Sequence, residues 1–178
     1  MAKRIETIYR QLLDQYGPQG WWPLNGIYKK EHLAKKLTAD EQFEIGVGAI
    51  LAQNTSWNNA EKALMNLKDK CMLDKERIKD IPVDRLATLI LSSGYHNQKA
   101  KKIKAFVAFL ASGKEMTREH LLDVWGIGPE TADSVLLYAH RQPFFVIDAY
   151  TKRIFSRLGL CKENIPYQEL RELFHNNL

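Results

Sequence analysis

Cysteine is scarce in this chain, whose 178 residues contain only Cys71 and Cys161 and no Cys-x-x-Cys pair. Neither a four-cysteine zinc site nor an iron–sulfur cluster can be built from them, and a disulfide scaffold is excluded. With 6 prolines and 10 glycines, the chain is neither collagen-like nor a proline-rich linker. No apolar run could span a bilayer, and residues 1–13 lack the apolar core of a signal peptide. We therefore expect a reduced, cytoplasmic protein that does not associate with membranes.

The composition is that of a globular protein, with 45% hydrophobic and 26% charged residues. A chain of this length buries roughly two thirds of its unfolded surface, which fits one domain or two small lobes. The net charge of +5 favours nucleic-acid partners only slightly. Residues 97–104 concentrate four lysines at the start of an expected helix. They form either a solvated helix face or a patch that contacts phosphates.

Apolar residues recur with helical periodicity along most of the chain. Only Gln142–Ile147 is strand-like, and a single run cannot form a sheet. We predict an all-α fold of roughly ten short helices. The expected helices are the amphipathic segment around Ile5–Leu13, followed by Phe43–Leu51, Trp57–Leu67, Asp74–Lys79, Val83–Ser92, His96–Ser112, Arg118–Val124, Glu130–His140, Ala149–Leu158 and Tyr167–Leu178.

The segment from Trp21 to Asp40 is the least regular part of the sequence. It carries the run Trp21-Trp22-Pro23, which predicts a loop with two large aromatic side chains. Two interpretations stay open at this point. The loop either packs as a plug on the surface, or its indole rings line a pocket.

The most specific local signal is residues 121–132, with the sequence LLDVWGIGPETA. Gly126 and Gly128 permit tight backbone geometry, and Pro129 at the first turn of a new helix sacrifices no hydrogen bond. The amides from Gly128 to Thr131 then form an anion site at a helix N-terminus. A plain corner between two helices would use the same glycines. A dinucleotide-binding fold is excluded, because this motif follows a helix and lacks the third glycine.

A second signal is Asp148, which follows the apolar residues 143–147 and precedes an expected helix. Asp is a common N-cap residue, and capping alone accounts for it. The functional interpretation is a carboxylate held rigidly at the mouth of a cleft.

Together, the Gly-Ile-Gly hairpin, the apolar helix and Val-Ile-Asp some twenty residues later resemble the helix-hairpin-helix DNA glycosylases of the endonuclease III superfamily. Residues 43–55 (FEIGVGAILAQNT) are similar to the second helix of that family and its DNA-contacting glutamine. Residues 93–101 (SGYHNQKAK) resemble its wedge loop and the helix that follows. The resemblance covers about residues 40–160, in the same order.

Within the superfamily, this chain is most similar to the 3-methyladenine DNA glycosylase branch that lacks an iron–sulfur cluster. Bifunctional members carry a lysine where this chain has Glu130, so the amine for a Schiff base is missing. The resemblance rests on Trp21-Trp22-Pro23, Gln53-Asn54-Thr55 and residues 97–101. Family members usually continue with further helices beyond the position of Leu178.

The resemblance implies two helical lobes with a DNA- and base-binding cleft between them. One lobe is expected from residues 1–40 plus about 155–178, incomplete relative to the family. The other is expected from residues 41–154, with the helix-hairpin-helix at about 118–140. The implied activity is hydrolysis of the N-glycosidic bond of flipped alkylated purines such as 3-methyladenine, without lyase activity.

The implied site residues fall into four groups. Asp148 is the expected catalytic carboxylate, with Glu130 as its competitor. The other groups are the base pocket (Trp21, Trp22 and Phe43), the DNA wedge (Gln53, Tyr95 and His96) and the phosphate contacts (Gly126, Gly128, the backbone of Glu130, Thr131, Lys99, Lys101 and Lys102).

We expect no cofactor and no side-chain metal site, only a K⁺ or Na⁺ ion at the hairpin carbonyls of Val124 and Gly126. The expected partner is double-stranded DNA containing a damaged base, bound by a monomer at the nucleoid of a bacterium or archaeon. Two alternatives stay open. One is a non-catalytic helix-hairpin-helix module that only binds DNA, and the other is a glycosylase for mismatched or oxidised bases.

Overall fold

The computed structural model describes residues 2–28 and 36–178, and it confirms the all-α expectation. Within these residues no sheet forms, and a single antiparallel bridge joins Leu24 to Ile27. The helices are α1 (Ala2–Tyr16), α2 (Ala39–Leu51), α3 (Trp57–Asp69), α4 (Lys75–Asp80), α5 (Val83–Leu89), α6 (His96–Ala111), α7 (Arg118–Leu122), α8 (Pro129–Ser134), α9 (Ala149–Arg157) and α10 (Tyr167–His175). A 3₁₀ turn spans Leu91–Ser93, and a π-helical turn, Val135–Ala139, continues α8.

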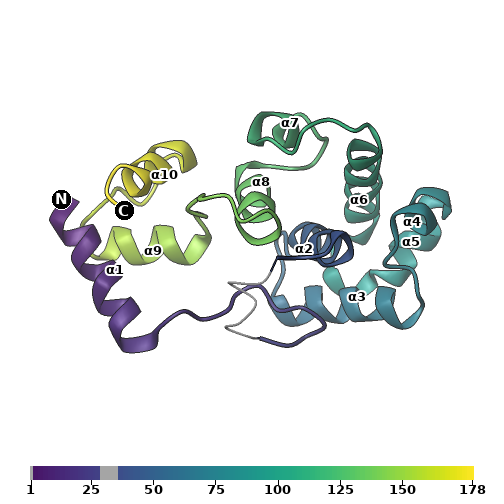
Figure 1. The fold of residues 1–178 in the computed structure, drawn as a ribbon, viewed down its shortest axis with the longest axis horizontal. Coiled ribbons are helices and arrows are strands. Elements are labelled where there is room, and N and C mark those ends of the chain that lie inside the picture. Colours follow the sequence, from purple (N-terminus) through teal and green to yellow (C-terminus); the bar gives the residue numbers. More distant parts are fainter. Residues whose placement is uncertain (1, 29–35) are drawn as a thin grey trace.

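The hydrophobic residues gather in two separate cores (Figure 1). The larger core is built by α2 to α8 together with Trp22, Leu24 and Leu37 from the N-terminal loop. The smaller core lies where α1, α9 and α10 meet, at the end of the molecule that holds both termini. It contains Ile5, Ile147, Phe155, Leu160, Leu170 and Phe174.

The cores divide the chain differently from the ranges expected above. Trp22, Leu24 and Leu37 belong to the larger core, although they precede residue 41. Ile147 belongs to the smaller core, although it precedes residue 155. The chain therefore passes from one core to the other in the segment just before Asp148.

Helix α2 runs through the middle of the larger core, and every residue from Phe43 to Leu51 is buried. Its N-terminus is fixed by a capping box, in which Thr38 and Glu41 exchange side-chain and backbone hydrogen bonds of 3.2 and 2.8 Å. Gly46 permits close contact with α6, because a Cβ atom there would lie only 2.6 Å from the Phe106 ring. The capping box and this close contact therefore fix α2 at its N-terminus and in its middle.

A buried carboxylate anchors the loop that carries the two adjacent tryptophans. Glu44 on α2 is only 4% exposed and pairs with the Lys68 ammonium at 2.6 Å. Its other oxygen accepts a 2.9 Å hydrogen bond from the amide of Asn25, and Lys68 also donates to the Asn25 side chain. Because a buried charge is tolerated only when it is paired, this arrangement fixes the loop against α2 and α3.

Candidate active-site cleft

A cleft of about 1020 Å³ opens between the two cores. Its volume is at the upper end of the range for ligand pockets, large enough for a nucleotide turned out of a duplex. Its walls come from the tryptophan loop, the end of α2 with the start of α3, Lys102 of α6, the hairpin with the helical turns that follow it, the segment around Asp148, and Tyr167. The lining residues are Trp21, Trp22, Ala49, Ala52, Gln53, Asn54, Thr55, Ser56, Trp57, Lys102, Gly126, Gly128, Pro129, Glu130, Thr131, Ser134, Tyr138, Phe145, Val146, Asp148, Tyr150, Thr151 and Tyr167.

Asp148 both caps α9 and faces the cleft, so the two interpretations of this residue are compatible. Its Oδ1 atom accepts hydrogen bonds from the backbone amide and the hydroxyl of Thr151, each 2.7 Å long. The other oxygen, Oδ2, accepts no hydrogen bond from any described residue. The cap therefore fixes the carboxylate while leaving one oxygen available to a substrate.

The charge of Asp148 acts on two further ionisable groups that line the cleft, Glu130 and Tyr138. Glu130 lies at the exposed side, yet solvent removal by the cleft walls raises the pKa of its carboxyl, and the Asp148 charge raises it further against the opposing effect of Lys152. Burial raises the pKa of Tyr138 to about 12, again assisted by Asp148. The cleft thus combines the Asp148 carboxyl group with two groups that hold their protons more strongly than usual.

One wall of the cleft consists of aromatic rings. Trp21 is 37% exposed, whereas Trp22 is only 7% exposed, so Trp21 presents more ring surface to the cleft. Trp57 lies 5.2 Å from Trp21 and 5.1 Å from Trp22, centroid to centroid, in edge-on contacts. Tyr138, on the π-helical turn, completes the cluster at 5.5 Å from Trp22. Both interpretations of this loop therefore hold. Trp22 is buried as part of a packed plug, and Trp21 is exposed in the lining of the cleft.

The hairpin is tied to the end of α2 through Gln53. The Gln53 amide donates to the carbonyl of Gly126 at 3.1 Å and to the hydroxyl of Thr131 at 2.9 Å. Its Oε1 atom accepts a 2.6 Å hydrogen bond from the Lys102 ammonium. These three bonds hold the side chain against the hairpin at the edge of the cleft.

The expected phosphate and cation contacts are affected by these bonds. The Thr131 hydroxyl oxygen accepts a hydrogen bond from Gln53, which leaves its O–H group able to donate to a phosphate together with the backbone amides of the hairpin. The carbonyls of Gly126 and Val124 already accept hydrogen bonds from Gln53 and from the amide of Ile127. The cation at these carbonyls stays a prediction. Across residues 2–28 and 36–178, no cluster of His, Cys, Asp or Glu side chains could hold a metal ion.

Comparison with known sequences decides the family. Residues 47–178 match the HhH-GPD superfamily base excision DNA repair proteins. The chain belongs to this superfamily. The match includes the end of α2, the hairpin and Asp148, and it confirms the resemblance on which the sequence-based expectations rest.

Relatives and solved structures agree with this assignment. A protein of Methanocaldococcus jannaschii named as a DNA repair glycosylase is 42% identical over 98% of this chain and 78% of its own length. Endonuclease III of Sulfolobus acidocaldarius is 31% identical over 94% of this chain and 75% of its own. The H. pylori 3-methyladenine DNA glycosylase bound to 1,N6-ethenoadenine has a TM-score of 0.78 at 29% identity, covering 99% of this chain and 80% of that one. An endonuclease III–DNA complex shares the fold, with a TM-score of 0.81 at 19% identity over 100% of this chain and 78% of that chain.

Phe43 does not lie in the cleft of this HhH-GPD protein, and the expectation that it faces the base is wrong. Its side chain is 4% exposed and belongs to the larger core, with the Lys75 ammonium 5.8 Å from its ring centroid. The position of Phe43 on α2 explains this. The cleft is lined by Ala49, Ala52 and Gln53, and a helix rises about 13 Å from Phe43 to Ala52.

Lys99 is also wrongly placed among the phosphate contacts. It is only 1% exposed, and its ammonium donates to the carbonyls of Leu51 and Ser93 at 2.8 and 2.6 Å. Burial, with a smaller contribution from Lys102, lowers its pKa to about 8. Lys101 is exposed and stays a predicted phosphate contact.

The expected wedge residues separate into two places. Tyr95 is 71% exposed with a backbone φ of +46°, and neither it nor His96 lines the cleft. Gln53 lines the cleft but is held by the hairpin. The wedge role of all three residues stays a prediction, and for Gln53 it requires the release of three hydrogen bonds.

Sequence reasoning missed two residues that connect the cleft to the rest of the fold. Asp133 is completely buried and pairs with Arg118 at 2.7 Å. Tyr167 lines the cleft and donates a 2.8 Å hydrogen bond to Asp133. The usable signal for Asp133 is an acidic residue on the same helical face as the apolar Ala132 and Leu136. Tyr167 carries no local signature, because its partners lie far away in the sequence.

In the hairpin, the substitution Gly126→Ala should lower the free energy of unfolding by about 1–3 kcal/mol. Gly126 has a φ of +83°, and an added Cβ would lie 2.4 Å from Cγ of Lys102. Gly128→Ala is the matched control, since nothing lies within 4 Å of a Cβ there. It should cost less than about 1 kcal/mol, the value of a changed N-cap. Urea unfolding curves test both variants, and equal losses would contradict the prediction.

The buried lysine predicts an unusual dependence of stability on pH. Lys99 binds its proton below about pH 8 when folded, against 10.5 for an ordinary lysine. Between these values the unfolded chain binds more protons, so stability rises with pH, by about 2 kcal/mol from pH 8 to 9.5. Urea unfolding at several pH values should show this rise in the wild type and its loss in Lys99→Met. Identical pH slopes for the two proteins would overturn the assignment.

Proposed function

We propose that this protein is a monofunctional DNA glycosylase that removes alkylated purines such as 3-methyladenine. A base inside a duplex cannot be reached, so the damaged nucleotide turns out into the cleft between the two cores. The hairpin amides bind a phosphate of the same strand, and Lys101 and Lys102 add positive charge beside it. The observation that carries this proposal is the position of Asp148, a rigidly capped carboxylate with one free oxygen in a cleft walled by aromatic rings.

The reaction demands little acid catalysis from the protein. An N-alkylated purine is cationic and departs as a neutral base. The group that needs stabilisation is the sugar, which becomes an oxocarbenium-like cation as the glycosidic bond breaks. The Asp148 carboxylate stabilises this positive charge and orients the attacking water. The aromatic wall favours a cationic base through cation–π attraction.

A second candidate substrate class is supported by Glu130. Neutral lesions must be protonated before they leave, and a carboxyl group with a raised pKa is suited to donate that proton. The structural relative from H. pylori was solved with 1,N6-ethenoadenine, which is a neutral adduct. In this alternative Glu130 is the general acid and Asp148 stabilises the sugar. Glu130→Gln should then reduce release of neutral lesions and leave release of 3-methyladenine unchanged.

Incubation with methylated DNA tests the proposal directly. The released bases are separated by chromatography, and free 3-methyladenine should appear in a time-dependent manner. Methylated DNA incubated without protein under identical conditions controls for spontaneous depurination. DNA binding without any base release above this control would favour the alternative of a non-catalytic binding module.

The absence of a lysine at position 130 predicts that no covalent intermediate forms. Treatment with borohydride during turnover should trap no protein–DNA adduct, and abasic DNA should stay intact, because no amine attacks the sugar. A trapped adduct in the wild type would overturn the monofunctional assignment. Lys102→Met would then show whether the lysine that lines the cleft is the nucleophile.

A further inference from the structure

The segment that leads into Asp148 has no regular secondary structure of its own. Residues 141–148 connect the π-helical turn to α9 and pass from the larger core to the smaller one. Two of its amides bond locally, from Gln142 to the carbonyl of Leu136 and from Phe144 to the carbonyl of Gln142. The two amides nearer to Asp148, those of Phe145 and Ile147, bond instead to side chains of α10.

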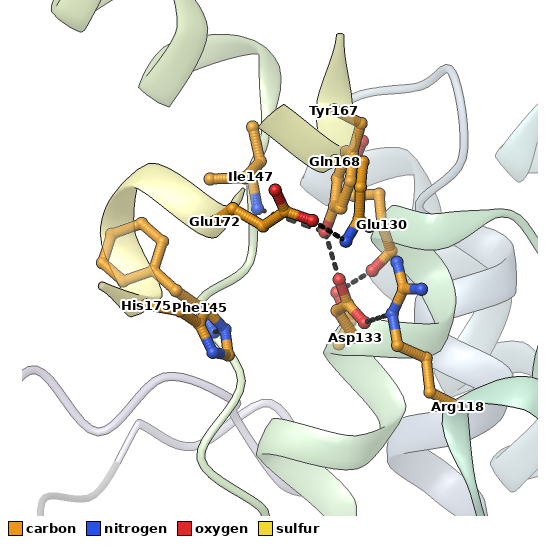
Figure 2. Close-up of polar contacts among 10 residues, drawn as sticks. Arg118, Glu130, Asp133, Phe145, Ile147, Tyr167, Gln168, Glu172 and His175 are labelled. Atoms are coloured by element: carbon orange, nitrogen blue, oxygen red, sulfur yellow. Dashed lines mark hydrogen bonds and ion pairs between the residues drawn. The ribbon is translucent and has the colours of Figure 1, made fainter. Parts of the chain in front are cut away.

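The first of these side chains is Tyr167, at the start of α10. Its hydroxyl oxygen accepts a long hydrogen bond, 3.4 Å, from the amide of Ile147, the residue directly before Asp148. The same hydroxyl donates at 2.8 Å to Oδ2 of the buried Asp133, as Figure 2 shows. Arg118 fixes the opposite oxygen of Asp133 at 2.7 Å. The amide before Asp148 is therefore connected through one phenol to an ion pair in the neighbouring core.

The second side chain is His175, at the end of α10. Its Nε2 atom accepts a 3.1 Å hydrogen bond from the amide of Phe145, which requires a neutral ring at this nitrogen. His175 is an exposed residue, yet partial loss of solvent around its ring lowers its pKa. The Arg171 and Arg118 charges lower this pKa further, against the opposing effect of Asp133, and the neutral form is favoured. The Phe145 ring stacks on Phe174 of the same helix, with centroids 4.0 Å apart and planes 3° from parallel.

We propose that Tyr167 and His175 are positioning residues, which hold the backbone before Asp148 so that its free oxygen faces the sugar of the flipped nucleotide. This inference rests on the proposed function of Asp148. It adds a role for α10 in the reaction, because that helix supplies both side chains.

The physical reason lies in how Asp148 itself is bonded. Its carboxylate bonds only to Thr151 of α9 among the described residues, so the cap fixes the side chain relative to α9 but not relative to the hairpin. The Tyr167 hydroxyl connects the two sides, because Asp133 belongs to α8 and Ile147 precedes α9. Displacement of a catalytic group by about 1 Å can reduce a rate by about a hundredfold. Loss of the Tyr167 hydroxyl should therefore reduce the reaction rate more than it reduces the affinity for the substrate.

The test compares Tyr167→Phe with Tyr9→Phe. The second variant is the control, because it removes the hydroxyl of an exposed tyrosine on α1. Each protein is measured for single-turnover release of 3-methyladenine and for binding of two DNA duplexes. One duplex carries a tetrahydrofuran abasic site, and the other carries a cationic pyrrolidine in its place. Tight binding of the cationic pyrrolidine requires a correctly placed carboxylate, whereas binding of the uncharged tetrahydrofuran does not. Tyr167→Phe should lose at least tenfold in release rate and at least fivefold in preference for pyrrolidine, with tetrahydrofuran binding within twofold of wild type.

A second pair of variants keeps the proposal testable if Tyr167→Phe is unstable. His175→Leu removes the acceptor for the Phe145 amide, whereas the side-chain carbonyl in His175→Gln can replace it. His175→Gln should retain most of the release rate and His175→Leu should not.

The outcomes distinguish a failure of the proposed function of Asp148 from a failure of the positioning role of Tyr167 and His175. If the wild type does not prefer pyrrolidine, or if Asp148→Asn keeps the preference, the proposed function of Asp148 fails. If that preference depends on Asp148 but folded Tyr167→Phe equals wild type in rate and preference, the positioning role fails. Equal rates for the two His175 variants would remove His175 from it.

Discussion

Asp148→Asn should reduce single-turnover base release by about a hundredfold to a thousandfold while DNA affinity stays within a few-fold of wild type. The substitution removes the negative charge that stabilises the sugar cation, a contribution worth about 3–4 kcal/mol or more in comparable electrostatic sites. The amide oxygen of Asn can still accept the two bonds from Thr151, so the cap of α9 is retained. Stability should therefore change little, and the reduced rate of base release should reflect a slower chemical step.

Asp74→Asn is a matched control for this experiment. Asp74 caps α4 by accepting a 2.9 Å hydrogen bond from the amide of Arg77, and it lies outside the cleft. The chemical change is the same and each carboxylate caps a helix through a backbone amide three residues on, but Asp74 lies outside the cleft. Both variants should melt within a few degrees of wild type, and only Asp148→Asn should lose activity. If Asp148→Asn releases the base at a near-wild-type rate, Asp148 is a cap and nothing more.

The elements that sequence predicts correctly are those specified by neighbouring residues. Pro129 begins α8 directly after Gly128, and Asp148 caps α9 after an apolar run. Both signals are local, because a cap or a first-turn proline acts within one helical turn. The hairpin and the candidate catalytic residue are therefore recognisable from the amino-acid sequence alone.

The errors concern residues whose role depends on packing between distant elements. Phe43 is apolar on a helix that is buried on all sides, and periodicity cannot show which end of such a helix reaches a cleft. Lys99 belongs to a lysine-rich run, but it shares a helical stripe with Ile103 and Phe106, both buried. That spacing is a usable signal for its burial. Tyr167 has no such signal, because it meets Asp133 across 34 positions.

Because Phe43 is buried in the larger core, the substrate should be selected by the aromatic residues that do line the cleft. The cleft has an aromatic wall built from Trp21, Trp22, Trp57 and Tyr138, and Phe43 is not part of it. Trp21 is the most exposed of these four residues, at 37%. A cationic methylated purine stacked on this ring gains about 0.5–2 kcal/mol of cation–π attraction, which a neutral purine lacks.

Trp21→Ala should therefore reduce release of 3-methyladenine more than tenfold, whereas Trp21→Phe should retain much of the rate. The combined loss of stacking and cation–π attraction accounts for this size, and a phenyl ring preserves part of both. Release of a neutral lesion such as 1,N6-ethenoadenine should fall less than release of 3-methyladenine, because only the cation loses the electrostatic part. Single-turnover rates for the two substrates at equal DNA saturation measure the difference.

Phe43→Ala separates a base-contacting ring from a core ring. Truncation of this buried side chain should lower stability by about 3–5 kcal/mol, as for other core phenylalanines. Below its melting temperature, the folded fraction should release 3-methyladenine at a rate close to wild type. Trp21→Ala should show the reverse pattern, with a small change in melting temperature and a large change in rate. A folded and fully active Trp21→Ala variant would show that this ring does not contact the base.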